Sequence, residues 1–127
     1  MSDIFWEKGR TAARSARLLL DHNDPNGATD RAYFAMFHGA RAALAHVDAA
    51  LAQTKRHATV IGRFGRHLVK DRGLDAEFGR ALSLAFDMRT VADYEPVVVD
   101  ASDAREVVES AERFLEALAS HSSGSNP

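Results

Sequence analysis

The apolar residues of this chain recur with the 3.6-residue period of an α-helix almost from end to end, and this periodicity most constrains the fold. The clearest stripe lies in the last third and consists of Ala104, Val107, Val108, Ala111, Phe114, Leu115 and Leu118. The β-branched run Val97-Val98-Val99 follows Pro96 and is predicted to be an extended linker rather than a strand. We therefore expect an all-α protein.

Turn and capping residues divide the chain into five predicted helices. Pro25 follows Asp24 at a strong break, Gly73 closes the third helix, and Pro96 follows the end of the fourth. The expected helices cover about 3–22, 25–47, 57–70, 75–94, and from Asp100 or Ser102 to about 121. These predict an up-and-down antiparallel helical bundle, four long helices plus one short helix, in a single domain over 1–121. Residues 122–127 are expected to be a disordered polar tail.

Composition excludes several kinds of site. The chain has no cysteine, which excludes disulfides, a thiolate zinc site and a cysteine nucleophile. It has no His-x-x-x-His motif and no pair of Glu-x-x-His motifs, so we expect no metal and no cofactor. No apolar stretch approaches the roughly 20 residues that span a bilayer. The first residues do not resemble a signal peptide, and we expect a cytoplasmic protein without a membrane contact.

Charge is distributed unevenly along a chain whose net charge is only −2. The segment 55–72 is basic, whereas 93–116 is acidic. Either the two segments attract each other or a partner subunit, or the basic segment contacts phosphate. Aromatic residues are not interleaved with the basic ones, which argues against recognition of single strands by stacking.

Arg89 occupies the buried stripe of the fourth predicted helix, together with Phe78, Leu82 and Ala85. Burying a lone guanidinium group costs several kcal/mol, so Arg89 must be paired, hydrated or functional. Asp93 lies one turn later and can reach it, although a cation before an anion is the less favourable order within a helix. We therefore predict that Arg89 faces another helix, a subunit or a ligand.

Basic residues on the second and third predicted helices are further candidates. Arg31 and His38, seven residues apart, lie on nearly the same face, and one of them is expected close to Arg89. Together they could bind an anion; alternatively, Arg31 pairs with a carboxylate such as Asp93 and His38 is a hydrogen-bonded interior histidine. His57 begins the third helix and could bind an anion with free backbone N–H groups, or serve as a local cap or packing contact.

Three segments together resemble the HEPN superfamily, in its small prokaryotic branch with an Arg-x-x-x-Asp-Tyr fourth helix. The run from Ala32 to Leu44 is similar to the second-helix signature. Lys55-Arg56-His57 is similar to the basic-histidine element, although Arg56 replaces the usual threonine. Gly79-Arg80-Ala81-Leu82, followed by Arg89 and Asp93-Tyr94, is similar to the fourth helix. The resemblance extends over nearly the whole chain.

The resemblance implies a helical bundle that homodimerises, contact with RNA or a nucleotide, and a nucleotidyltransferase-like partner in a toxin–antitoxin-like pair. Exposed apolar surface at Phe34 and Phe37 is also expected to favour a homodimer. Many HEPN proteins are metal-independent ribonucleases with an Arg-x4-6-His motif at this place. Here Tyr94 stands where the histidine of Arg-x4-His would follow Arg89.

Tyr94 is a poor substitute for histidine in proton transfer, because an unshifted tyrosine has a pKa of about 10. Arg89 could still hold a phosphate through two hydrogen bonds. The leading hypothesis is therefore a non-catalytic or weakly catalytic binding module. The alternatives are a metal-independent endoribonuclease, in which His38, His57 or Tyr94 transfers the proton, and a structural homodimer with no nucleic-acid role.

Overall fold

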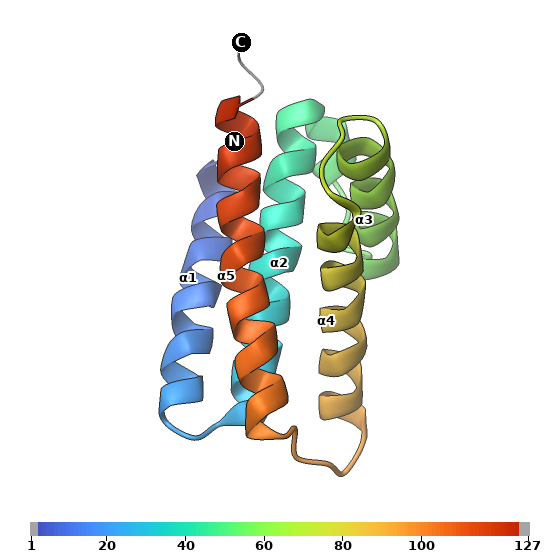
Figure 1. The fold of residues 1–127 in the computed structure, drawn as a ribbon. Coiled ribbons are helices and arrows are strands. Elements are labelled where there is room, and N and C mark those ends of the chain that lie inside the picture. Colours follow the sequence, from blue (N-terminus) through green and yellow to red (C-terminus); the bar gives the residue numbers. More distant parts are fainter. Residues whose placement is uncertain (1–2, 125–127) are drawn as a thin grey trace.

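The computed structural model describes residues 3–124, and all the regular secondary structure within that range is helical. Short connections join five α-helices, of which α3 is the shortest (Figure 1). The helices are α1 (Asp3–Asp21), α2 (Pro25–Val47), α3 (His57–Phe64), α4 (Ala76–Tyr94) and α5 (Ala101–Gly124). A 3₁₀ helix, η1 (Ala49–Ala52), precedes α3, and a π-helical segment, η2 (Gly65–Lys70), continues it. The prediction of an all-α protein is confirmed.

Local capping explains where the helices begin. The side chain of Asp24 accepts a hydrogen bond from the backbone N–H of Gly27, with Pro25 in the first turn of α2. Asp75 and Asp100 do the same at the starts of α4 and α5. Gly73 has a φ of 74°, a left-handed conformation that ends the third helix as its sequence position predicts.

Three predicted boundaries differ from the structure in detail. The third predicted helix is helical throughout, but beyond Phe64 it has π-helical spacing, with the Asp71 N–H bonded to the Arg66 carbonyl. The predicted loop before it contains η1. Finally, α5 continues to Gly124, into the segment 122–127 that was expected to be disordered. Residues 125–127 of that segment lie outside the described residues.

Helix α2 is the centre of the molecule and packs against α1, α3, α4 and α5 (Figure 1). Its many small residues allow this close approach. A Cβ added to Gly39 would lie 2.6 Å from the Cδ2 atom of Leu115 on α5. A Cβ added to Gly9 of α1 would lie 3.1 Å from the carbonyl oxygen of Ala35. The sequence of α2 therefore permits neighbours on several sides, and this brings candidate residues from different helices together.

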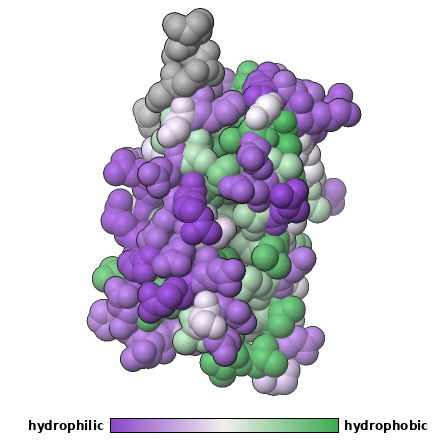
Figure 2. Space-filling view, in the orientation of Figure 1, coloured by the Kyte–Doolittle hydropathy of each residue, from purple (hydrophilic) through white to green (hydrophobic). Residues whose placement is uncertain are grey.

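The surface has an apolar side and a polar side. In Figure 2, hydrophilic residues dominate over α1 and α5, and hydrophobic residues gather toward the side of α4. Leu84, Val91 and Tyr94 of α4, and Val98 just beyond it, are all exposed. Within the described range, no helix is long and apolar enough to cross a membrane.

Candidate functional site

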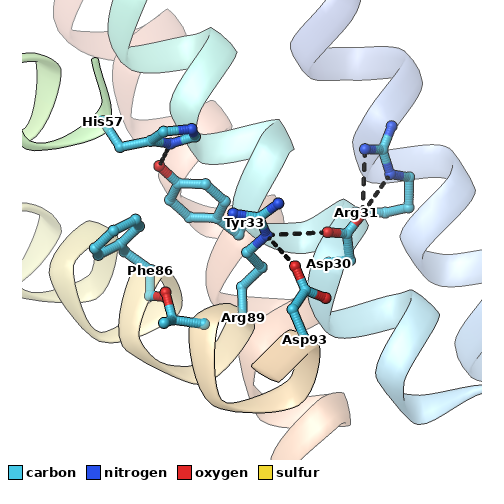
Figure 3. Close-up of polar contacts among 8 residues, drawn as sticks. Asp30, Arg31, Tyr33, His57, Phe86, Arg89 and Asp93 are labelled. Atoms are coloured by element: carbon cyan, nitrogen blue, oxygen red, sulfur yellow. Dashed lines mark hydrogen bonds and ion pairs between the residues drawn. The ribbon is translucent and has the colours of Figure 1, made fainter. Parts of the chain in front are cut away.

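Arg89 projects from α4 toward α2 and meets two carboxylates there (Figure 3). Its Nε atom lies 2.8 Å from Oδ2 of Asp93, one turn later on α4, and 3.3 Å from Oδ1 of Asp30 on α2. The Arg89 side chain is 22% exposed. The predicted pairing with Asp93 and the predicted approach to another helix are both confirmed. The pair Arg89 and Asp93 has the less favourable cation-before-anion order within a helix, and Asp30 of the other helix supplies a second anion for Arg89.

Asp30 also binds Arg31, so three ion pairs connect four residues of alternating charge, in the order Arg31, Asp30, Arg89, Asp93 (Figure 3). Nη2 of Arg31 lies 3.2 Å from Oδ2 of Asp30. Arg31 therefore pairs with a carboxylate, as one interpretation expected, but that carboxylate is Asp30 and not the suggested Asp93, which binds Arg89. The four formal charges of this group, the Arg89 cluster, sum to zero.

Both arginines of the cluster lie over the ring of Phe34. The guanidinium carbon of Arg89 is 5.1 Å from the ring centroid, and that of Arg31 is 5.0 Å from it. At these distances the ring attracts each cation electrostatically. Phe34 therefore helps to fix both guanidinium groups and is not the free apolar surface expected for a dimer. Phe37, the other residue of that expected surface, is only 4% exposed within the monomer.

His57 turns its ring into the protein instead of toward the start of α3. Its Nδ1 atom lies 2.5 Å from the hydroxyl oxygen of Tyr33, and the two share a hydrogen bond (Figure 3). The ring stacks on Phe37 and Phe86, at centroid distances of 4.6 Å and 5.6 Å. Of the two interpretations of His57, the structure shows the packing contact.

Burial keeps this histidine–tyrosine pair neutral at pH 7. Burial lowers the pKa of His57 from its ordinary value, and the nearby cation of Arg89 lowers it further. Burial raises the pKa of Tyr33, and Arg89 opposes that rise only in part. Nε2 of His57 makes no hydrogen bond within residues 3–124. The result is a neutral imidazole with one free nitrogen beside a guanidinium group.

The two remaining predicted residues take no part in the ion pairs of this arrangement. His38 lies beside a cavity between α1 and α2, and its Nδ1 atom is buried without a hydrogen-bond partner. The interpretation of His38 as a hydrogen-bonded interior histidine is therefore wrong. Tyr94, which replaces the histidine of the ribonuclease motif, is 79% exposed at the end of α4.

The sequence interpretation missed Asp30, and it placed Tyr33 and Phe34 only in the core or at an interface. The spacing of Asp30, Phe34 and Phe37 contains the signal, because they follow the i, i+4, i+7 rhythm of one helix face. An aspartate on an otherwise aromatic face requires a cation, and Arg89 provides it. In the described part of the chain, no group of three His, Asp or Glu residues could hold a metal ion.

Sequence comparisons relate this chain to known proteins. The sequence profile of the HEPN domain matches residues 2–121. A protein of Methanocaldococcus jannaschii that carries the provisional name of a toxin is 29% identical over 104 residues, 82% of this chain and 75% of the relative. The UPF0332 protein of Thermotoga maritima is 28% identical, covering 90% of this chain and 86% of its own length. A UPF0332 protein of Gloeobacter violaceus is 30% identical, covering 88% of each chain.

The profile match spans nearly the whole chain, and the three relatives align with most of it. The quoted similarities of the second, third and fourth helices therefore reflect common descent. This chain belongs to the HEPN domain family.

Proposed function

We propose that this chain is a toxin-like HEPN binding module whose Arg89 cluster contacts a phosphate of RNA or of a nucleotide. One observation carries the proposal. Asp30 and Asp93 both approach Nε of Arg89, and the two terminal Nη groups donate no hydrogen bond to any described residue. Four N–H donors are thus available on a guanidinium group that is already held in place. Family membership and the toxin name of one relative support the same proposal.

The geometry suits binding of a phosphate by a guanidinium group that is already held in position. An arginine that offers both Nη groups can bind two oxygens of one phosphate, and the energy is greater when its side chain is already ordered. Carboxylates at Nε and the ring of Phe34 provide this order. A phosphate would add a negative charge to a neutral cluster, so we expect modest affinity that weakens as the salt concentration rises.

Titration of labelled RNA into the wild type and into Arg89→Ala tests the proposal. The variant should bind about tenfold more weakly, because a charge-assisted hydrogen bond contributes roughly 1.5–3 kcal/mol. Arg80→Ala is the matched control, since Arg80 is an exposed arginine on the same helix outside the cluster. Equal binding by all three proteins would contradict the proposal. Melting temperatures would show that both variants are folded.

A specific observation favours a second candidate function, a metal-independent endoribonuclease. Nε2 of His57 is free and lies on a neutral ring near Arg89. In such a reaction His57 accepts the proton of the RNA 2′-hydroxyl, whose oxygen attacks phosphorus. The bond to the 5′-oxygen breaks, and that oxygen takes a proton from water. Arg89 holds the phosphate as its charge increases.

RNA cleavage in the presence of a chelator tests this second function. Activity should fall at least about a hundredfold in His57→Gln, the lower bound typical for losing a positioned general base. His46→Gln is the control, because His46 is exposed in the last turn of α2. RNA binding with no cleavage would leave the binding module as the function, and a fully active His57→Gln variant would exclude His57 as the base.

Proposed partners follow from the family and from the apolar side of the molecule. We propose a homodimer through the outer surface of α4, where Leu84 and Val91 are exposed one above the other, seven residues apart. Val91→Glu should give a monomer in sedimentation at tens of micromolar, where a roughly micromolar dimer would persist. A dimer that survives this change would place the contact elsewhere.

A nucleotidyltransferase-like protein is the proposed second partner. Expression of a toxin-like chain should slow growth, and coexpression of the nucleotidyltransferase-like partner should relieve the effect.

The short connections between consecutive helices, such as residues 22–24, support the proposed up-and-down antiparallel order of the bundle.

A further inference from the structure

A second polar group lies between α1 and α2, outside the Arg89 cluster except for Arg31. It surrounds a cavity of about 410 Å³. Lys8, Thr11 and Ser15 line it from one face of α1, and Arg31 and His38 line it from α2. The lining therefore contains two cations, two hydroxyl groups and an imidazole. Among the described side chains that line it, only Glu7, next to Lys8 in the sequence, carries a carboxylate.

The donors around this cavity are largely unused. Lys8 forms no ion pair with any side chain that the structure describes. Arg31 binds Asp30 through Nε and Nη2, which leaves Nη1 free. The oxygen of Thr11 accepts a bond from Arg14, so its O–H can still donate. The cavity thus offers several donors and little negative charge to neutralise them.

His38 is a neutral donor within this set. Its pKa is lowered to about 4 by burial and then by the cations of Lys8, Arg41 and Arg31, so the ring is neutral at pH 7. Nδ1 is buried with no partner, whereas Nε2 is not among the buried unpaired atoms. A proton on Nε2 leaves that N–H able to donate to a ligand, and it leaves only a lone pair unsatisfied at Nδ1.

We propose that this cavity binds the terminal phosphate of a small ligand through Lys8, Arg31, Ser15 and Nε2 of His38. A carboxylate has only two oxygens for these donors, whereas a terminal phosphate presents three and carries up to two charges. Two cations can balance those charges, as in charge-assisted phosphate sites. The inference does not depend on phosphate binding at Arg89, because Lys8 and Ser15 do not belong to that cluster.

Calorimetric titration with inorganic phosphate, against chloride at equal ionic strength, is the direct test. We expect saturable binding that weakens about tenfold in Lys8→Ala, and less in Ser15→Ala, where a neutral donor is lost. Arg10→Ala is the matched control: it removes an exposed cation two residues further along α1, which lines a different groove, against α5. It should leave the phosphate affinity unchanged. The ring nitrogens of His38 should shift on binding in nuclear magnetic resonance spectra.

Three outcomes would overturn the proposal. One is no binding at about 10 mM phosphate, where even a millimolar site would be nearly saturated. Another is an equal loss in Lys8→Ala and Arg10→Ala, which would indicate nonspecific attraction to positive charge. The third is binding abolished by Arg89→Ala and untouched by Lys8→Ala, which would place the phosphate in the Arg89 cluster. Failure at Lys8 with intact RNA binding through Arg89 would leave the proposed function standing.

Two sources of a terminal phosphate are distinguished by further titrations. Adenosine monophosphate represents a free nucleotide, and a short RNA with a 5′-phosphate represents an RNA end. Binding of the nucleotide with the same sensitivity to Lys8→Ala supports the proposed small ligand. An RNA whose affinity depends on its 5′-phosphate and on Lys8, with no binding of the nucleotide, would overturn the small ligand in favour of an RNA end.

Discussion

His57 and His38 contact the same aromatic ring but have opposite surroundings. Their ring centroids lie 6.0 Å and 5.9 Å from that of Phe34, and burial lowers the pKa of both. His57 is bonded to Tyr33 and stacked between two phenylalanines. His38 has a buried nitrogen without a partner, beside a polar cavity. Nδ1 is therefore satisfied by a hydrogen bond in His57 and left unsatisfied in His38.

The difference also separates the two candidate sites. In the Arg89 cluster each cation already has an anion, and the free donors are both Nη groups of Arg89 and Nη1 of Arg31. Around His38 the cation of Lys8 has no carboxylate partner among the described residues. The first site is held rigid by its own contacts, and the second would gain most of its order from a ligand.

Replacing each histidine by alanine should show the largest contrast. His57→Ala removes four ring contacts and leaves the buried Tyr33 hydroxyl without a partner, so the free energy of unfolding should fall by about 2–4 kcal/mol. His38→Ala should cost about 1 kcal/mol, since no hydrogen bond is lost. Urea denaturation measures both, with His46→Ala as an exposed control. Equal losses of unfolding free energy in His57→Ala and His38→Ala would contradict the proposed difference between the two histidines.

Acid should destabilise the protein through His38. In the unfolded chain this histidine gains a proton as the pH falls below about 6.5, whereas the folded protein resists protonation down to a pKa of about 4. Stability should therefore fall as the pH is lowered through this window. The loss should be about 1–2 kcal/mol once solvent screening at this half-buried ring is allowed for.

The pH dependence has a matched variant. His38→Gln should flatten the stability curve between about pH 6.5 and 4, because glutamine does not titrate. His46→Gln should leave the slope as in the wild type. A slope that persists in full in His38→Gln would assign the effect to other groups, His57 first, since its pKa is also lowered.

Tyr33→Phe should have a smaller effect on stability, and it should leave Nδ1 of His57 without a partner, as Nδ1 of His38 already is. Tyr33→Phe removes the hydroxyl that bonds Nδ1 of His57, and it should cost about 1 kcal/mol of unfolding free energy. Tyr94→Phe is the control, because Tyr94 is 79% exposed and its hydroxyl bonds no described residue. Stability unchanged in Tyr33→Phe would mean that the hydrogen bond between Tyr33 and His57 contributes nothing measurable.

The smallest expected effects concern the neighbouring cations. Burial is the main cause of the low pKa in both histidines, and a cation is the second cause: Arg89 for His57 and Lys8 for His38. Arg89→Ala should therefore raise the pKa of His57 without changing that of His38, and Lys8→Ala should do the reverse. Titration followed by nuclear magnetic resonance measures both values. A shift of both histidines in either variant would show that the two sites are electrostatically coupled.

Local contacts explain which predictions were confirmed. The break at Asp24 and Pro25, the start of the fifth helix at Asp100 and the pairing of Arg89 with Asp93 each involve residues within a few positions of one another. The sequence displays such contacts directly, since a helix brings residues i and i+4 together wherever it forms. The family resemblance identified the same helices and was confirmed over residues 2–121.

Long-range contacts explain the errors. Arg89 meets Asp30 across 59 residues, and His57 meets Tyr33 across 24. The sequence suggested Asp93 as one carboxylate that Arg31 could bind, but helix packing brings Arg89 to Asp93, and Arg31 binds Asp30. It likewise offered Phe34 and Phe37 as dimer surface, whereas two arginines lie over the first ring and the core contains the second.

The sequence by itself determined the helices, their caps, the family and the position of Arg89 on an inward face. These properties follow from the helical period and from hydrogen bonds within a turn or two, which need no tertiary partner. Only the tertiary structure decided that the Nδ1 atom of His57 is bonded to Tyr33, whereas that of His38 is buried without a partner beside a cavity. The partner of a ring nitrogen is set by which helices pack beside it, and packing depends on the shapes of side chains far apart in the sequence.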